Sequence, residues 1–293
     1  LSAVNREGQL TPLGRQLARL PVDPRLGRML LEGARQGSLA EVLIIASALS
    51  VQDVRERPPE RQQAADQAHA QWKDVDSDFA ALVNLWRGFE EQRQALGASA
   101  LRSWCRKNFL NYLRLREWRD SHRQLSLICK ELQLFSHAGR SELARDQLEV
   151  GAGKDREQAR SYKAVGWVER SDTHAAETPR WVSPDGSTHP TQAAQPGVDY
   201  ARVHKAILSG LLSQIGQKTE EGDYLGARQR RFWIHPSSGL GRKRPQWLMS
   251  AELVETTKLY ARQVAKIEPD WIEPLAGHLI KQNHFEPHWE KNR

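Results

Sequence analysis

Apolar residues recur at helical spacing through the first part of this chain. Residues 1–37 read as a turn followed by two short helices. Two helix starts combine a capping side chain with a proline at the first helical position: Thr11 with Pro12, and Asp23 with Pro24. Gly37 predicts the end of the second helix, because glycine readily adopts the left-handed conformation found after a helix C-terminus.

Residues 38–135 predict an all-helical bundle. The first helix has an apolar stripe wide enough to be buried on most sides: Leu39, Val42, Leu43, Ile44, Ile45, Ala46 and Leu49. The second helix is marked, after a cap at Ser77, by Phe79, Leu82, Val83, Trp86 and Phe89. The stretch 101–134 predicts a third helical tract with these residues facing inward: Leu101, Cys105, Phe109, Tyr112 and Leu113.

The periodicity fades over residues 136–199, where glycine, serine, threonine, proline and alanine dominate. A segment of this length and composition is typical of a linker, an insertion or disorder. Helical spacing returns at 203–215, and from Arg231 onward short apolar runs alternate with turn signals, which predicts a small β-rich domain. The expected fold class is therefore α+β with several domains.

The composition narrows the class of protein. The 293 residues include 43 lysines and arginines against 36 aspartates and glutamates, for a net charge of +7, which favours a polyanionic partner without establishing one. Cys105 and Cys129 are too few for a disulfide framework and predict reduced thiols in a cytoplasmic protein. No apolar run approaches the ~18 residues that span a membrane, so no membrane partner is expected.

The strongest candidate site lies in the β-rich domain, where two clusters of cations flank an aromatic run. The cations are Arg228, Arg230, Arg231, Arg242, Lys243 and Arg244. Cations beside aromatic rings suit a single nucleic-acid strand, which offers phosphates to one and base faces to the other. His235, Ser237 and Ser238 lie between the clusters and add groups that hydrogen-bond a phosphate or a 2′-hydroxyl. Strand alternation points Phe232 and Trp233 to opposite faces, so some of these aromatics are expected in the core.

Two further basic features lie in the helical part. Within the third tract Arg116, Arg119 and Arg123 share one helical face, which suits contact with successive phosphates but equally an ordinary solvated face with interleaved acids. After the first helix, Arg55 and Arg57 precede two prolines that stiffen the chain. This loop is either a rigid contact to a nucleic acid or another domain, or a plain charged helix end.

Catalytic motifs of the common classes are absent from the sequence. It contains no phosphate-binding loop with a lysine and hydroxyl residue, no G-x-S-x-G elbow and no H-E-x-x-H motif. We therefore predict no catalytic residue and no metal ligand in this chain.

Several long stretches resemble DEAH-box ATP-dependent RNA helicases, in particular the large bacterial HrpA type. They are LTPLGRQLARLPVDPRLGRMLL, IIASALSVQDVRERP, SDFAALVNLW, WCRKNFLNYLRLREW, IHPSSGL, and the tract from WLMSAELVETTKLYARQVAKIEP to EPHWE. The resemblance covers roughly three quarters of the chain, and its specificity rests on many ordered matches rather than on one motif.

The resemblance implies a domain order: the C-terminal part of a winged helix at 1–37, a helical ratchet domain at 38–135, a linker or insertion at 136–199, an OB-fold at 200–280, and the start of a truncated extension at 281–293. It implies a region that guides single-stranded RNA in an ATP-dependent helicase moving 3′ to 5′. The RecA-like motor domains are then the expected partner, with protein regulators as further partners. No cofactor is expected in this stretch, because ATP and Mg²⁺ would belong to the motor domains.

Three points stay open in the sequence. The motor motifs of the family have no counterpart here, so we expect a fragment that is inactive alone, within a parent that hydrolyses ATP. The insert at 161–191 does not belong to the family pattern, which allows a disrupted remnant. A competing hypothesis is a protein-interaction module that docks regulators or ribosomal partners without binding RNA itself.

Overall fold

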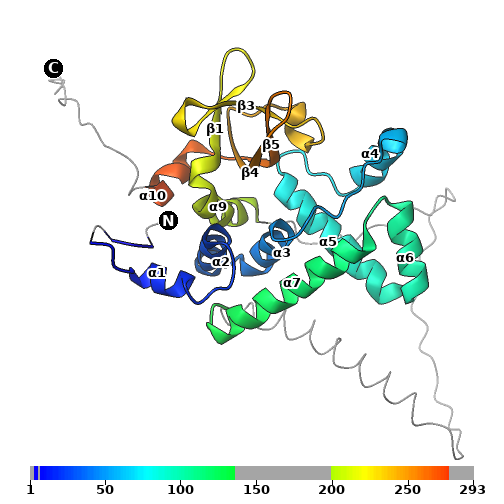
Figure 1. Ribbon diagram of the computed structural model, residues 1–293, viewed down its shortest axis with the longest axis horizontal. Coiled ribbons are helices and arrows are strands. Elements are labelled where there is room, and N and C mark those ends of the chain that lie inside the picture. Colours follow the sequence, from blue (N-terminus) through cyan, green and yellow to red (C-terminus); the bar gives the residue numbers. More distant parts are fainter. Residues whose placement is uncertain (1–2, 6, 136–198, 277–293) are drawn as a thin grey trace, which may run out of the picture. The chain divides into compact units, whose positions relative to one another are not determined.

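A computed structural model describes residues 3–5, 7–135 and 199–276 of the chain (Figure 1). Apart from residue 199, the predicted linker or insertion lies outside these residues, and so does the predicted extension at 281–293. Within the described ranges, no helix is both long and apolar enough to cross a membrane.

Helices make up the described part before residue 136, and strands dominate after residue 214. The α-helices are α1 (Pro12–Leu17), α2 (Pro24–Gln36), α3 (Leu39–Leu49), α4 (Gln62–Ala70), α5 (Asp78–Ala95), α6 (Ala98–Lys107), α7 (Tyr112–Glu131), α9 (Tyr200–Leu211) and α10 (Ile272–Ala276). The strands are β1 (Ile215–Lys218), β2 (Tyr224–Gly226), β3 (Arg231–Ile234), β4 (Trp247–Glu255) and β5 (Leu259–Lys266).

The helix boundaries confirm the capping signals of the sequence. The Thr11 hydroxyl accepts a hydrogen bond from the Gly14 amide at 3.0 Å, and Asp23 accepts one from the Arg25 amide at 2.8 Å. Gly37 ends α2 with a φ of 70°, in the left-handed region. Local sequence therefore sets the ends of these helices before any tertiary contact is considered.

The prediction of one continuous tract over 101–134 is wrong. The chain turns between α6 and α7, where Phe109 has a φ of 53° and Asn111 caps the new helix by accepting from the Leu113 amide at 3.1 Å. The break changes which face of the chain turns inward. Leu101 is buried as expected, whereas Leu113 is 64% exposed, contrary to the prediction.

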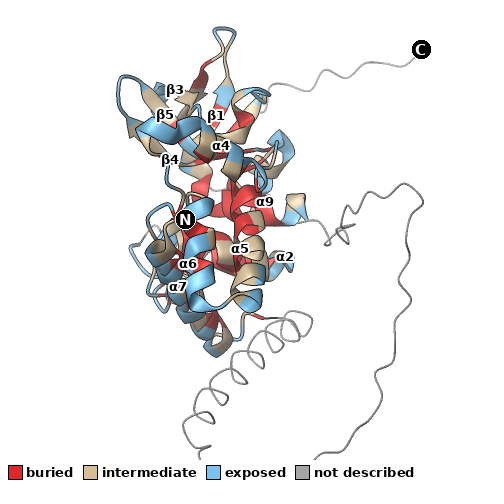
Figure 2. Cartoon of the chain, turned by 90° about the vertical axis from the view of Figure 1, so that its right-hand side faces the viewer, coloured by how far each residue is buried: buried red, intermediate tan, exposed pale blue. Residues whose placement is uncertain are grey.

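Helix α9 joins the helical core although more than 60 residues separate it from α7 in the sequence. It packs against α2, and most of its residues are buried (Figure 2). A Cβ atom at Gly210 would lie 2.4 Å from the Arg25 carbonyl oxygen, so the two helix backbones approach closely there because this residue lacks a side chain. The Ser209 hydroxyl also donates to the Arg28 carbonyl oxygen at 3.3 Å.

The strands close into a barrel in the order β1-β2-β3-β5-β4. β3 and β5 are parallel, and the other neighbours are antiparallel. Phe232 is 1% exposed inside the barrel, while Trp233 faces outward with the Lys258 ammonium 4.7 Å from its ring centre. This confirms the alternation predicted for the aromatic run, and the five-stranded barrel confirms the expected OB-type domain.

Candidate nucleic-acid interface

A groove of about 1110 Å³ runs between the helical part and the barrel. Its walls come from the α2 N-terminus, the loop after α3, helices α4, α5 and α7, the loop after β3, and strands β4 and β5. Five residues predicted from the sequence line it together: Arg55, Arg57, His235, Ser237 and Ser238. The fold therefore brings two sequence features, about 180 residues apart, to one concave surface.

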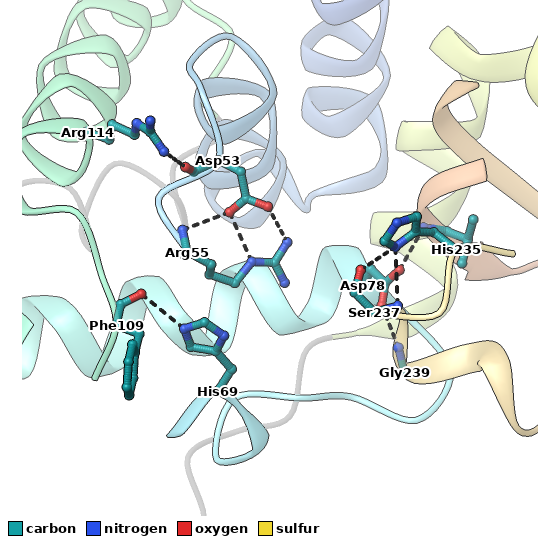
Figure 3. Close-up of polar contacts among 10 residues, drawn as sticks. Asp53, Arg55, His69, Asp78, Phe109, Arg114, His235, Ser237 and Gly239 are labelled. Atoms are coloured by element: carbon teal, nitrogen blue, oxygen red, sulfur yellow. Dashed lines mark hydrogen bonds and ion pairs between the residues drawn. The ribbon is translucent and has the colours of Figure 1, made fainter. Parts of the chain in front are cut away.

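The loop after α3 holds Arg55 in a fixed position (Figure 3). Asp53 accepts two hydrogen bonds from its guanidinium, at 3.0 Å from Nε and 2.8 Å from Nη2. Backbone pairing between Arg55 and Leu110 anchors the loop to the start of α7. Burial alone would raise the pKa of Asp53, but the charge and hydrogen bonds of Arg55 outweigh it and hold that pKa below its usual value. The pair is ionised at neutral pH, and the Nη1 donors of Arg55 lie outside it.

Arg57, two residues further along the same loop, forms a second bidentate ion pair. Its Nε and Nη2 atoms donate to the two oxygens of Asp66 in α4, at 2.8 and 2.7 Å. These bonds raise the pKa of Arg57 and lower the pKa of Asp66. A bidentate pair fixes the plane of a guanidinium, so both arginines are pre-oriented and each keeps Nη1 for a further acceptor.

The barrel side of the groove is a short polar loop after β3. His235 Nδ1 accepts the Ser237 amide hydrogen at 3.2 Å and lies 2.7 Å from the Ser237 hydroxyl. Burial, with added repulsion from Arg262 and Arg57, lowers the pKa of His235, so its ring is neutral at pH 7. The ring proton then sits on Nε2, where it can be donated to a phosphate or a 2′-hydroxyl.

Ser238 has a structural bond as well as a place in the groove. Its hydroxyl oxygen accepts from the Leu240 amide at 3.2 Å and caps the 3-10 turn Gly239–Gly241. The hydroxyl hydrogen remains available as a donor, because a serine oxygen accepts and donates at once.

The groove lining contains both positive and negative side chains. Its cations are Arg25, Arg55, Arg57, Lys73, Arg114 and Arg262, and its carboxylates are Asp23, Asp53, Asp66, Asp78 and Glu252. Arg25, Arg55 and Arg57 each form an ion pair with a groove carboxylate. The field inside is therefore weaker than the number of cations suggests, and hydrogen-bond geometry contributes more to recognition than net charge does.

Comparison with known proteins places these features in a family. Three family models match: the winged-helix part of a helicase-associated domain (HA2) at residues 1–22, its ratchet-like part at 23–82, and an oligonucleotide/oligosaccharide-binding (OB)-fold at 203–280. The chain is 43% identical to the ATP-dependent RNA helicase HrpA of Escherichia coli (strain K12) over 284 residues, 97% of this chain. The chain is an HrpA-type helicase-associated region.

An HrpA homolog of Haemophilus influenzae is 42% identical over 285 residues, again 97% of this chain. In both cases the HrpA-type region spans 18% of the relative's own length. The winged-helix and ratchet models meet at residues 22–23, whereas the sequence pattern led us to divide these domains at 37–38.

The cationic clusters of the HrpA-type barrel are exposed, but they do not line the groove. Arg228 lies in the turn between β2 and β3, Arg230 follows that turn, and Arg231 pairs with Glu221 and Asp223 at 3.0 and 2.9 Å. In the second cluster, Lys243 pairs with Asp76 at 3.0 Å, and the clusters also contain Arg242 and Arg244. The six barrel cations therefore lie outside this groove, and their role in binding stays a prediction.

Helix α7 turns a different face to the groove than the one chosen from the sequence. Arg116 and Arg123 are exposed, and Arg119 pairs with Glu90 at 2.8 Å. The groove instead receives the stripe that contains Arg114, Ser121, Gln124, Leu125 and Ile128. The three predicted arginines thus share a face, but the structure does not bring them to the groove.

Sequence reasoning missed Arg114, which donates from Nη1 to the Asp53 carbonyl oxygen at 2.9 Å. It stands seven residues before Ser121 and eleven before the buried Leu125, so it lies at the border of the apolar stripe. An arginine at the border of an apolar helix stripe can reach a neighbouring element, and this position could have indicated Arg114 as a groove residue. Arg25, Lys73 and Arg262 gave no comparable signal, because only the tertiary fold brings them to the groove.

Metal binding finds no support in the described residues. Among them, no group of three or more histidine, cysteine, aspartate or glutamate side chains is arranged to hold a metal ion.

Proposed function

We propose that this HrpA-type region guides single-stranded RNA through the groove between its helical part and its barrel. The observation that carries the proposal is the convergence of Arg55 and Arg57 from one wall with His235 and Ser237 from the other. Fixed guanidinium groups suit phosphates, and a neutral imidazole beside a hydroxyl suits the 2′-hydroxyl of ribose. The OB-fold match and the RNA helicase relatives support the choice of RNA.

In the whole protein, we propose, this region works in the cytoplasm with RecA-like motor domains that bind ATP and Mg²⁺ and move 3′ to 5′ on RNA. The two relatives are named as an ATP-dependent RNA helicase and its homolog, and the present chain spans a small part of them. The role of this region is to position the strand while the motor supplies the work. The isolated chain is then inactive toward ATP, with or without RNA.

Binding of a fluorescent single-stranded RNA at several salt concentrations tests the groove. The chain without substitutions, called the parent chain from here on, should bind with a slope of log affinity against log salt of about −2. This slope corresponds to about three neutralised phosphates, a small number because the groove arginines are already ion-paired. Replacing Arg55→Gln and Arg57→Gln together should weaken binding about tenfold or more at low salt and flatten the slope. Arg19→Gln is the matched control, because Arg19 is exposed and lies outside the groove.

Equal binding by the double variant and the parent would exclude the groove as the RNA site. Each lost ion pair is partly exposed, so the unfolding free energy should fall by less than about 1 kcal/mol per pair, which would not explain the loss of binding. Charge-removing variants of Arg228 and Arg230 measure any separate contribution of the barrel clusters.

A protein-docking role is a second candidate, favoured by one surface. Leu113 is 64% exposed beside Tyr112, and these residues share a shallow hollow with Arg102 and Arg106. An exposed leucine next to cations suits an acidic protein segment with an apolar side chain. Absence of RNA binding by the parent chain, together with binding of a purified regulator that Leu113→Asp abolishes, would favour this role.

A further inference from the structure

The segment before α5 is the joint between the helical part and the barrel. Ser77 pairs with Ala265 as an isolated β-bridge, and the Lys266 amide donates to the Asp76 carbonyl oxygen at 2.9 Å. The Tyr200 hydroxyl lies 2.8 Å from that same oxygen and 2.9 Å from the Lys266 carbonyl oxygen. A β-bridge and a backbone hydrogen bond thus hold this turn against β5, and the Tyr200 hydroxyl links the two segments.

Asp78 adds the bond that reaches the groove loop. One carboxylate oxygen accepts from the Gly239 amide at 3.1 Å, and the other accepts from the Val264 amide at 3.0 Å (Figure 3). Asp78 is 8% exposed, so its charge is largely withdrawn from water and is stabilised by these donors and by the start of its own helix. A carboxylate that only began a helix would need neither the bond to Gly239 nor the bond to Val264, so these two bonds indicate a further role.

Gly239 gives independent support for a tight fit. A Cβ atom there would lie 2.4 Å from the Asp74 carbonyl oxygen, so any other residue would push the loop away from the α5 turn. The same loop carries Ser237 and Ser238, which line the groove. The distance between the two groove walls therefore depends on the contacts that Asp78 and Gly239 make between this loop and the start of α5.

We infer that Asp78 is a positioning residue for RNA binding: its carboxylate holds the loop that carries Ser237 and Ser238 at a fixed separation from Arg55 and Arg57. The inference rests on the proposed function. An RNA strand that contacts both groove walls requires a fixed distance between them. If the loop moves away, Ser237 and Ser238 lose their contacts with RNA, whereas Arg55 and Arg57 keep theirs.

Asp78→Asn separates this role from size, and its change in charge works against the expected result, because removing a carboxylate from the groove by itself favours RNA. The asparagine keeps the size of the side chain but presents an NH₂ group to one of the two amide donors, so one bond is lost. Asp76→Asn is the matched control: Asp76 lies in the same turn and pairs with Lys243, but its side chain is outside the groove. Both variants are studied in the full chain, with folding checked by circular dichroism.

Three measurements decide the inference. For Asp78→Asn we expect amide exchange over 235–241 to rise at least about tenfold and RNA affinity to fall about five- to tenfold, while the salt slope stays unchanged because Arg55 and Arg57 keep their phosphate contacts. Asp76→Asn should change each by less than about twofold. A merely structural role would lower the folded fraction and leave amide exchange over 235–241 no higher than in the rest of the chain, and that result would overturn the inference.

Gly239→Ala covers the case in which Asp78→Asn fails to fold. The added Cβ meets the Asp74 carbonyl oxygen and displaces the same loop from the α5 turn, while the carboxylate stays intact, so the variant should weaken RNA binding in the same way. Parent-like RNA affinity in Gly239→Ala would also overturn the inference. If the parent chain itself binds no RNA, the proposed function fails, while exchange over 235–241 still shows whether Asp78 holds the loop.

Discussion

At the scale of single residues, burial decides which titratable groups are neutral. His204 is fully buried in α9, with Nδ1 2.7 Å from the Tyr200 carbonyl oxygen and Nε2 2.6 Å from the Ser77 hydroxyl. Burial lowers its pKa to about 4, although the backbone bond opposes the change. The His122 ring lies 4.6 Å from the Trp86 ring, centre to centre, at a tilt of 40°, and burial with repulsion from Arg119 lowers the pKa of His122 to about 4 as well.

These histidines predict acid sensitivity. In the unfolded chain a histidine titrates near ~6.5, so between about pH 6.5 and 4 the unfolded state binds protons that the folded state excludes. The contribution of His204 to stability is therefore constant above about pH 7 and falls as the pH drops through that window, by about 2 kcal/mol at pH 5 and about 3 kcal/mol at pH 4. Urea unfolding at pH 7.5 and 5 measures the difference. A parent-like pH dependence in His204→Gln would contradict the assignment.

At the scale of elements, close backbone approaches outweigh helix propensity. Glycine inside a helix usually costs about 1 kcal/mol relative to alanine. In α9, however, Gly210 faces α2 at a point where an added Cβ would meet the Arg25 carbonyl oxygen. The gain in propensity is then smaller than the cost of separating two packed helices.

Gly210→Ala is therefore expected to destabilise the chain by about 1–3 kcal/mol instead of stabilising it, which is the range for overpacking. Gly97→Ala is the control, because nothing lies within 4 Å of a Cβ atom at that position and its effect should stay within about 0.5 kcal/mol. Urea denaturation followed by tryptophan fluorescence gives both values. Greater stability of the Gly210 variant would show that α2 and α9 are less tightly packed than described.

At the scale of the whole molecule, the two thiols report on the helical core. Cys105 and Cys129 are both fully buried, and burial raises their pKa values to about 11 and about 12. A protonated, inaccessible thiol is a poor nucleophile. The folded chain should therefore resist a thiol reagent at pH 8, and both cysteines should react over the urea range in which fluorescence reports unfolding. Fast labelling of either thiol without urea would contradict this picture of the core.

The sequence by itself determined the elements that depend on near neighbours. Caps at Thr11 and Asp23, the left-handed end at Gly37 and the alternation of Phe232 with Trp233 all follow from interactions within a few residues. The long ordered matches also indicated the helicase-associated family. The prediction of one continuous helical tract over 101–134 was wrong. Asn111 is a local capping signal for a new helix, but the apolar pattern continues across it and hid the break.

Only the tertiary structure decided which cations form the groove. Arg55, Arg57 and Arg114 line the groove, whereas the longer cationic clusters at 228–231 and 242–244 lie outside it. A run of arginines in the sequence records local charge, but a groove requires two walls, and their meeting depends on long-range bonds such as those of Asp78. Such bonds join residues far apart in the chain, and no periodicity or local composition encodes that pairing.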